Sequence, residues 1–70
     1  MNWRPMPGDL CKYMSRVLLV TGNPYPADRF HPTELWVETI EIDENMPRRV
    51  RCDTLTLIQR AEGNDNDQRV

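Results

Sequence analysis

The chain has 70 residues, with nine basic and eleven acidic side chains and a formal net charge of -2. This length allows one domain with a core of about a dozen apolar side chains, which favours a binding surface over an enclosed active site. The sequence has no run of 18 apolar residues and no basic segment followed by an apolar stretch, so we expect neither a membrane span nor a secretory signal. We therefore expect a soluble cytoplasmic protein, or one of the host cytoplasm or virion if a phage encodes it.

The first predicted strands follow an N-terminal extension, residues 1–7. Pro5 and Pro7 lack an N–H and fix φ, so regular structure is expected to begin at Gly8. Residues 9–14 alternate with the period of a strand, and the short apolar run 17–21 predicts the most buried strand.

A long second loop is predicted over residues 23–33. Its three prolines exclude a central strand and disfavour a helix. Loops of this length in small domains are usually functional or disordered, and we expect partial order because this one carries Tyr25, Phe30 and His31.

Residues 34–43 predict a third strand whose apolar alternation changes phase near Glu38–Thr39, which suggests a β-bulge or a strong bend. Residues 43–45 predict a hairpin turn in which Asn45 takes a positive φ. Residues 46–51 return as a fourth strand, and Pro47 marks it as an edge or irregular strand.

The chain is expected to close with one helical turn at residues 52–54 and a short fifth strand that ends near Arg60. The polar residues 61–70 predict a flexible tail. The expected domain is therefore residues 8–60.

The order of these elements resembles that of small stand-alone SH3-like β-barrels of phages and bacteria. The resemblance lies in three segments: Pro7-Gly8-Asp9-Leu10, Leu19-Val20-Thr21-Gly22 and Arg49 to Ile58. It implies an all-β fold, a small five-stranded SH3-like barrel with a long second loop and a one-turn 3-10 helix before the last strand. The acidic-aromatic loop of proline-peptide-binding SH3 domains and the glycine-rich basic hairpin of KOW-type barrels are absent, so the resemblance implies no ligand.

The sequence contains no residue pattern typical of a catalytic, metal or cofactor site. His31, Glu34 and Asp28 are close in sequence, but a metal needs three or four ligands held in place, and Asp28 and His31 lie on a proline-broken loop. The lone histidine has no nucleophile motif around it, so we expect no enzyme and no cofactor. Cys11 and Cys52 are expected to be reduced thiols rather than a disulfide.

Aromatic side chains in and after the long loop are the first candidate site. Tyr25, Phe30, His31 and Trp36 are candidate contacts for a protein partner, which could be a second copy or a larger assembly. The alternative is that Phe30 and Trp36 plug the open end of the barrel, and for Trp36 we expect core packing.

Arginines form the second candidate site. Arg49 and Arg51 share one face of the fourth strand and Arg48 points the other way, a strip that could contact phosphates of a nucleic acid. The alternative is an edge strand protected by charge, with Glu38, Glu41 and Asp43 pairing across to the arginines. The sequence thus predicts a non-catalytic protein-interaction module, such as a phage accessory or virion structural protein. A nucleic-acid-binding barrel is the alternative.

Overall fold

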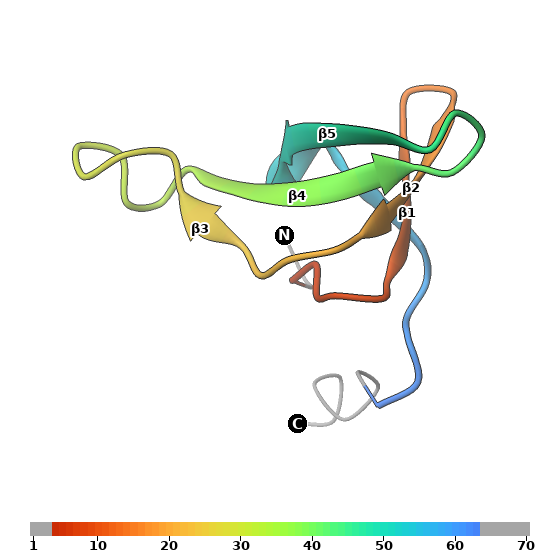
Figure 1. Ribbon diagram of the computed structural model, residues 1–70. Coiled ribbons are helices and arrows are strands. Elements are labelled where there is room, and N and C mark those ends of the chain that lie inside the picture. The colour runs from red at the N-terminus through yellow and green to blue at the C-terminus, as the bar shows by residue number, and fades with distance from the viewer. Residues whose placement is uncertain (1–3, 64–70) are drawn as a thin grey trace.

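The computed structural model describes residues 4–63, which form six strands and one 3-10 helix (Figure 1). The elements are β1 (Leu10–Tyr13), β2 (Arg16–Val20), β3 (Tyr25–Pro26), β4 (Leu35–Glu41), β5 (Met46–Arg51), η1 (Cys52–Thr54) and β6 (Thr56–Gln59). The prediction of an all-β domain with a 3-10 turn before the last strand is confirmed.

The strands form one antiparallel sheet in the order β6-β1-β2-β4-β5, with β3 beside the first residues of β4. The predicted strand count is wrong by one, because Tyr25 and Pro26 pair with Trp36 and Leu35. Pro26 is tolerated there since β3 pairs on one side only. Across residues 4–63 no ladder joins β5 to β6, so the sheet is open where a barrel would close.

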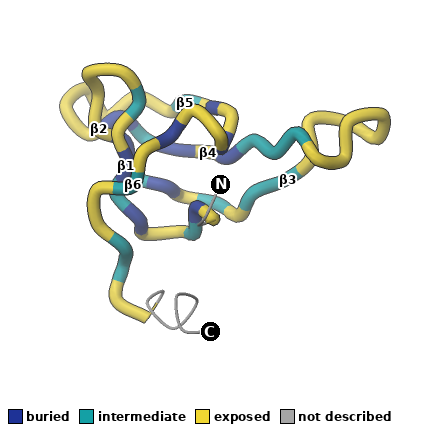
Figure 2. The backbone as a smooth tube through the Cα atoms, turned by 180° about the vertical axis from the view of Figure 1, so that it is seen from behind, coloured by how far each residue is buried: buried dark blue, intermediate teal, exposed yellow. Residues whose placement is uncertain are grey.

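The core lies on one face of the sheet, which we call the inner face. β2 pairs with β1 on one side and β4 on the other, and it contributes Leu18 and Val20, each at most 1% exposed. The buried apolar set is Cys11, Leu18, Val20, Val37, Val50, Cys52 and Leu55. Figure 2 shows the buried segments gathered in the body of the domain and the exposed loop at the tip of an arm made by β3 and the start of β4.

The predicted change of phase near Glu38–Thr39 is wrong, because buried and more exposed residues alternate regularly along β4. β4 runs without a register shift against β2 and β5. Its buried residues share one parity and are Val37, Thr39 and Glu41. The isoleucines therefore face away from the core, and Ile42 is 46% exposed. Thr39 is tolerated inside because its Oγ1 donates to the Arg48 carbonyl oxygen at 2.9 Å.

The hairpins and the edge strand agree with the sequence. Asn45 has a φ of 52° in the β4–β5 turn, and Met14 has a φ of 56° in the β1–β2 turn. β5 pairs with β4 alone, so Pro47 lies on an edge strand as predicted. A register shift occurs instead between β1 and β6, at Leu10 and Cys11.

Asp9 ties the start of the sheet to its end. Its carboxylate is fully buried and accepts backbone N–H groups of Met6 at 3.0 Å and Ala61 at 2.9 Å. Gly8 has a φ of 95°, and an added Cβ would lie 2.7 Å from the Cβ of Ala61. Of the predicted extension and tail, residues 1–3 and 64–70 lie outside the described residues. Within residues 4–63 no helix has the length and apolar character needed to cross a membrane.

Candidate functional site

The face of the sheet opposite the core, the outer face, gathers most of the predicted site residues. Strand register aligns Tyr25, Trp36 and Arg51 in one row and Glu38 and Arg49 in the next. Each of these side chains is exposed or half-buried. The two predicted surfaces, aromatic and basic, are therefore largely one surface.

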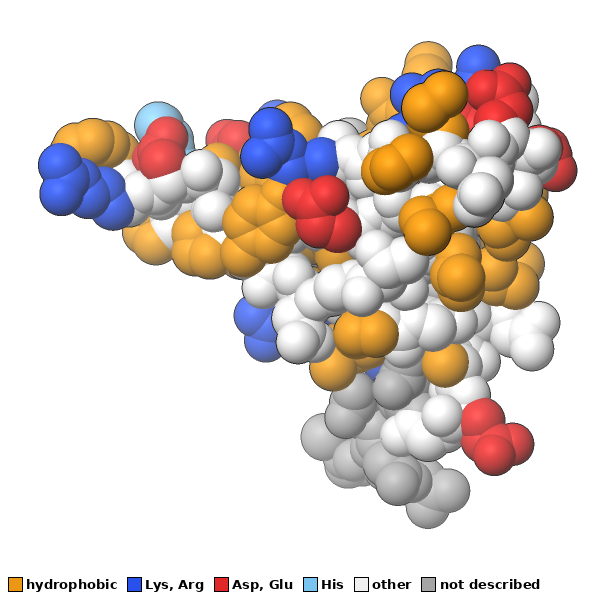
Figure 3. All heavy atoms as spheres, viewed as in Figure 1, with side chains coloured by type: hydrophobic (Ala, Val, Ile, Leu, Met, Phe, Trp, Pro, Cys, Tyr) orange, Lys and Arg blue, Asp and Glu red, His pale blue; other side chains and the backbone are white. Residues whose placement is uncertain are grey.

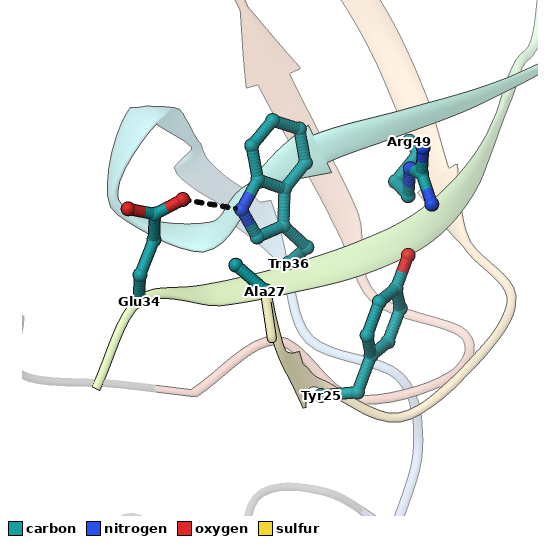
Figure 4. A pocket seen from close by; sticks show the side chains of 5 residues that line it. All are labelled: Tyr25, Ala27, Glu34, Trp36 and Arg49. Atoms are coloured by element: carbon teal, nitrogen blue, oxygen red, sulfur yellow. Dashed lines mark hydrogen bonds between the residues drawn. The ribbon is translucent and has the colours of Figure 1, made fainter. Parts of the chain in front are cut away.

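A groove opens on the outer face where the arm leaves the body of the domain. It holds about 180 Å³ and is lined by Tyr25, Ala27, Glu34, Trp36 and Arg49. Figure 4 shows Glu34 on one side of the Trp36 indole, and Tyr25 with Arg49 on the other. Core packing, the prediction for Trp36, is wrong, because the ring is half-buried in this groove and outside the buried core.

Polar contacts hold the groove side chains in place. Trp36 Nε1 donates to Glu34 Oε2 at 2.9 Å, and the Tyr25 hydroxyl donates to Glu38 Oε2 at 2.6 Å. The Arg49 guanidinium lies 6.0 Å from the Trp36 ring centroid, within the range of a cation–π contact. The groove thus combines aromatic rings with one cation and one carboxylate, and a second carboxylate, Glu38, lies beside it.

The Tyr25 hydroxyl remains a donor at neutral pH. Desolvation raises its pKa above the usual 10.0, and its hydrogen bond to Glu38 raises that pKa further, while Arg49 acts in the opposite direction. Since the neutral phenol keeps its proton, it continues to orient the Glu38 carboxylate.

The arginine strip is divided among three environments. Arg48 turns to the inner face, and its Nε donates to Glu41 Oε1 at 2.6 Å. Arg51 lies on the outer face, and its Nη2 pairs with Asp53 Oδ2 at 2.8 Å. Arg49 remains at the groove. The strip therefore does not present three adjacent cations in one direction.

Glu41 is a buried carboxylate that the alternation of the sequence did not reveal. It is 3% exposed and receives Arg48 on one oxygen and Arg16 Nη1 on the other. The hydrogen bond from Arg48 lowers its pKa from 4.5, with Arg16 acting in the same direction and desolvation opposing both. The signal available in the sequence is the set of three arginines near three acidic residues, Glu38, Glu41 and Asp43, which predicts pairing at the surface rather than a buried cluster.

The tip of the arm carries the other predicted contacts. Phe30 is 75% exposed, and the Arg29 guanidinium lies 5.2 Å from its ring centroid. His31 Nδ1 lies 2.9 Å from Asp28 Oδ1, which also accepts the Phe30 N–H at 2.8 Å. The structure therefore brings Tyr25 to the groove but leaves Phe30 and His31 at the tip, where they do not line it.

An apolar row adjoins the groove on the outer face. Register aligns Leu10, Leu19, Ile40 and Pro47 across four strands, one row beyond Glu38 and Arg49. Figure 3 shows hydrophobic side chains over the body of the domain and charged ones of both signs at the base of the arm. A partner in the groove would thus have further apolar surface beside it.

Possible metal ligands and thiols were the remaining reactive groups of the sequence. In residues 4–63 no three metal-ligating side chains come together. Cys11 and Cys52 are buried free thiols. Burial raises the pKa of Cys11 to about 12, with Asp9 adding to the rise, and burial also raises that of Cys52, so both stay protonated and unreactive at neutral pH.

Comparison of the chain with protein-family models, curated proteins and solved structures gave no match in any of the three.

Proposed function

We propose that the chain is a non-catalytic protein-interaction module of SH3-like architecture, and that its partner binds the outer face at the groove. The observation that carries this proposal is the convergence of Tyr25 from β3 and Trp36 from β4 beside Arg49 in an open groove. Aromatic and arginine side chains in such settings provide much of the energy of protein interfaces.

The order of elements along the chain supports the SH3-like part of the proposal. Short strands, a long loop after the second strand and a 3-10 turn before the last strand are the features that the resemblance implies. The resemblance to phage barrels extends the proposal to an accessory or structural role in a phage. Because one fold can carry many functions, the binding role is argued from the groove residues and not from the SH3-like architecture.

The arm is proposed to contribute a second set of contacts. The loop 23–33 contains three prolines, which reduce the conformational entropy that a loop loses when a partner orders it. Phe30 at the tip offers a large apolar ring that no fold requirement explains, since it is 75% exposed.

Nucleic-acid binding is the competing function. Arg49 and Arg51 face the same way, which favours it, but Arg51 is paired with Asp53, and Glu38 lies opposite Arg49. Carboxylates so close to the cations lower the positive potential available to phosphates.

Capture of partners from native lysate, with and without nuclease, separates the two functions. We expect Tyr25→Ala with Phe30→Ala to reduce capture more than Arg49→Ala with Arg51→Ala, and nuclease to have no effect. Circular dichroism of each variant provides the control for folding. Capture that nuclease or the double arginine variant abolishes, and that falls steeply with salt, would favour nucleic acid.

A further inference from the structure

We propose that the partner segment combines an apolar or aromatic side chain, which enters the groove against Trp36 and Tyr25, with a carboxylate two residues away that pairs with Arg49. This inference rests on the proposed function, because it states the chemistry of the partner at the same groove. It commits to an acidic segment rather than a basic or neutral one.

The first reason is that Arg49 has no carboxylate paired with it among residues 4–63. A guanidinium has five N–H donors, and most arginines of the described residues have a carboxylate within 4.0 Å. These pairs are Arg16 and Arg48 with Glu41, Arg51 with Asp53, and Arg60 with Asp9. Arg49 belongs to none of the ion pairs of residues 4–63. It is therefore the groove cation that an incoming carboxylate would neutralise.

The second reason is that Arg49 is already oriented. Its guanidinium lies 6.0 Å from the centre of the Trp36 ring, within the range of a cation–π contact. A cation that is already attracted to a neighbouring ring loses less freedom when it binds a carboxylate than a mobile surface arginine does.

The third reason is that the carboxylates in and beside the groove already have donors. Glu34 accepts the Trp36 indole N–H, and Glu38 accepts the Tyr25 hydroxyl. A cationic partner would have to compete with these donors and would approach Arg49 as a like charge. An incoming carboxylate also approaches the like charges of Glu34 and Glu38, but each of these already accepts a hydrogen bond, whereas Arg49 supplies donors that no ion pair of residues 4–63 uses.

The spacing of two residues follows from strand geometry. Arg49 lies opposite Glu38, which is two residues from Trp36 along β4. Side chains two apart in an extended segment point the same way, about 6.6–6.8 Å from each other. A segment lying along β4 can therefore place one side chain at Trp36 and the next on that side at Arg49.

The test uses the full-length chain labelled with ¹⁵N and three blocked peptides. These are acetyl-Ser-Phe-Ser-Glu-Ser-amide and the same peptide with Gln or Lys in place of Glu. The readout is the indole N–H resonance of Trp36, which is distinguished from that of Trp3 by its loss in Trp36→Phe. We expect the Glu peptide to bind about two to five times more tightly than the Gln peptide, and the Lys peptide to bind most weakly.

Two arginine variants provide the matched comparison. Arg49→Gln is expected to remove the preference for Glu over Gln, whereas Arg51→Gln, which alters an arginine already paired with Asp53, is expected to keep it. Equal binding of the Glu and Gln peptides, a preference for Lys, or no indole shift with any peptide would overturn this inference. The proposed function would still stand after such a result if capture of the native partner depends on Tyr25 and Phe30, so the two failures are distinguishable.

Discussion

Replacing Leu18 with Ala removes an isopropyl group from a fully enclosed position of the central strand. Leu18 is 0% exposed, so at about 0.8 kcal/mol for each buried carbon the loss of transfer free energy is about 2.4 kcal/mol. The cavity that remains raises the expected loss to about 3–4 kcal/mol. A domain of 70 residues has a free energy of unfolding of about 3.5–10 kcal/mol, so this variant should lose a large part of its stability.

Val17→Ala provides the matched control, because Val17 is the next residue of β2 and lies on the outer face with 36% exposure. Its loss should stay near 1 kcal/mol, since water fills the space vacated on an open face. Thermal unfolding followed by circular dichroism should lower Tm by about 12–30 °C for Leu18→Ala and by about 4–8 °C for Val17→Ala. Equal decreases, or a larger one for Val17→Ala, would refute the assignment of inner and outer faces.

Three further predictions concern groups outside the groove. The pKa of Glu41 is lowered in the folded state, so its contribution to stability is present above pH 4.5 and is lost as the pH falls through the folded pKa. Glu41→Gln should therefore flatten the acid side of a profile of Tm against pH. An unchanged slope would contradict the buried pairing of Glu41 with Arg16 and Arg48. Cys11 and Cys52 should resist iodoacetamide in the folded protein, and both should react once denaturant is added without reductant. Intact mass reports the number of modified thiols. An unmodified protein two hydrogens lighter than the reduced chain would show a disulfide instead. Gly8→Ala should lower the free energy of unfolding by more than about 1 kcal/mol in a denaturant titration, because its φ is 95° and the added Cβ would meet Ala61; a neutral result would mean that this junction relaxes freely.

The local signals in the sequence were sufficient for most of the fold. Period-2 alternation identified β1, and prolines bounded the long loop and marked β5 as an edge strand. Asn45 indicated the hairpin, because a positive φ favours a few residue types. These features depend on residues close together in the chain, which is why a single sequence reveals them.

The phase of β4 was not predictable in the same way. Ile40 and Ile42 look like core residues by hydropathy, yet Thr39 and Glu41 take the buried positions. Glu41 is tolerated there only because Arg16, 25 residues away, and Arg48 both reach it. Such compensation between distant segments is invisible to local alternation.

The candidate site was predictable in its residue types but not in its layout. Tyr25, Trp36 and the arginines were identified from aromatic and charge patterns. The pairing of β3 and β5 with β4 decides the layout. It places Arg49 at the groove beside Tyr25 and Trp36 and turns Arg48 to the inner face. The separation of Phe30 and His31 from the groove likewise depends on the length of the arm.

The central claim, that a protein partner is held at the outer-face groove, is tested most directly by the affinity of the captured partner for Trp36→Ala. The control is Met14→Ala, since Met14 is 78% exposed in the β1–β2 turn and does not line the groove. With folding verified by circular dichroism, calorimetry should give a Kd raised at least about tenfold for Trp36→Ala, and an unchanged Kd for Met14→Ala. A folded Trp36→Ala protein that binds the partner as tightly as the unaltered chain would contradict the account.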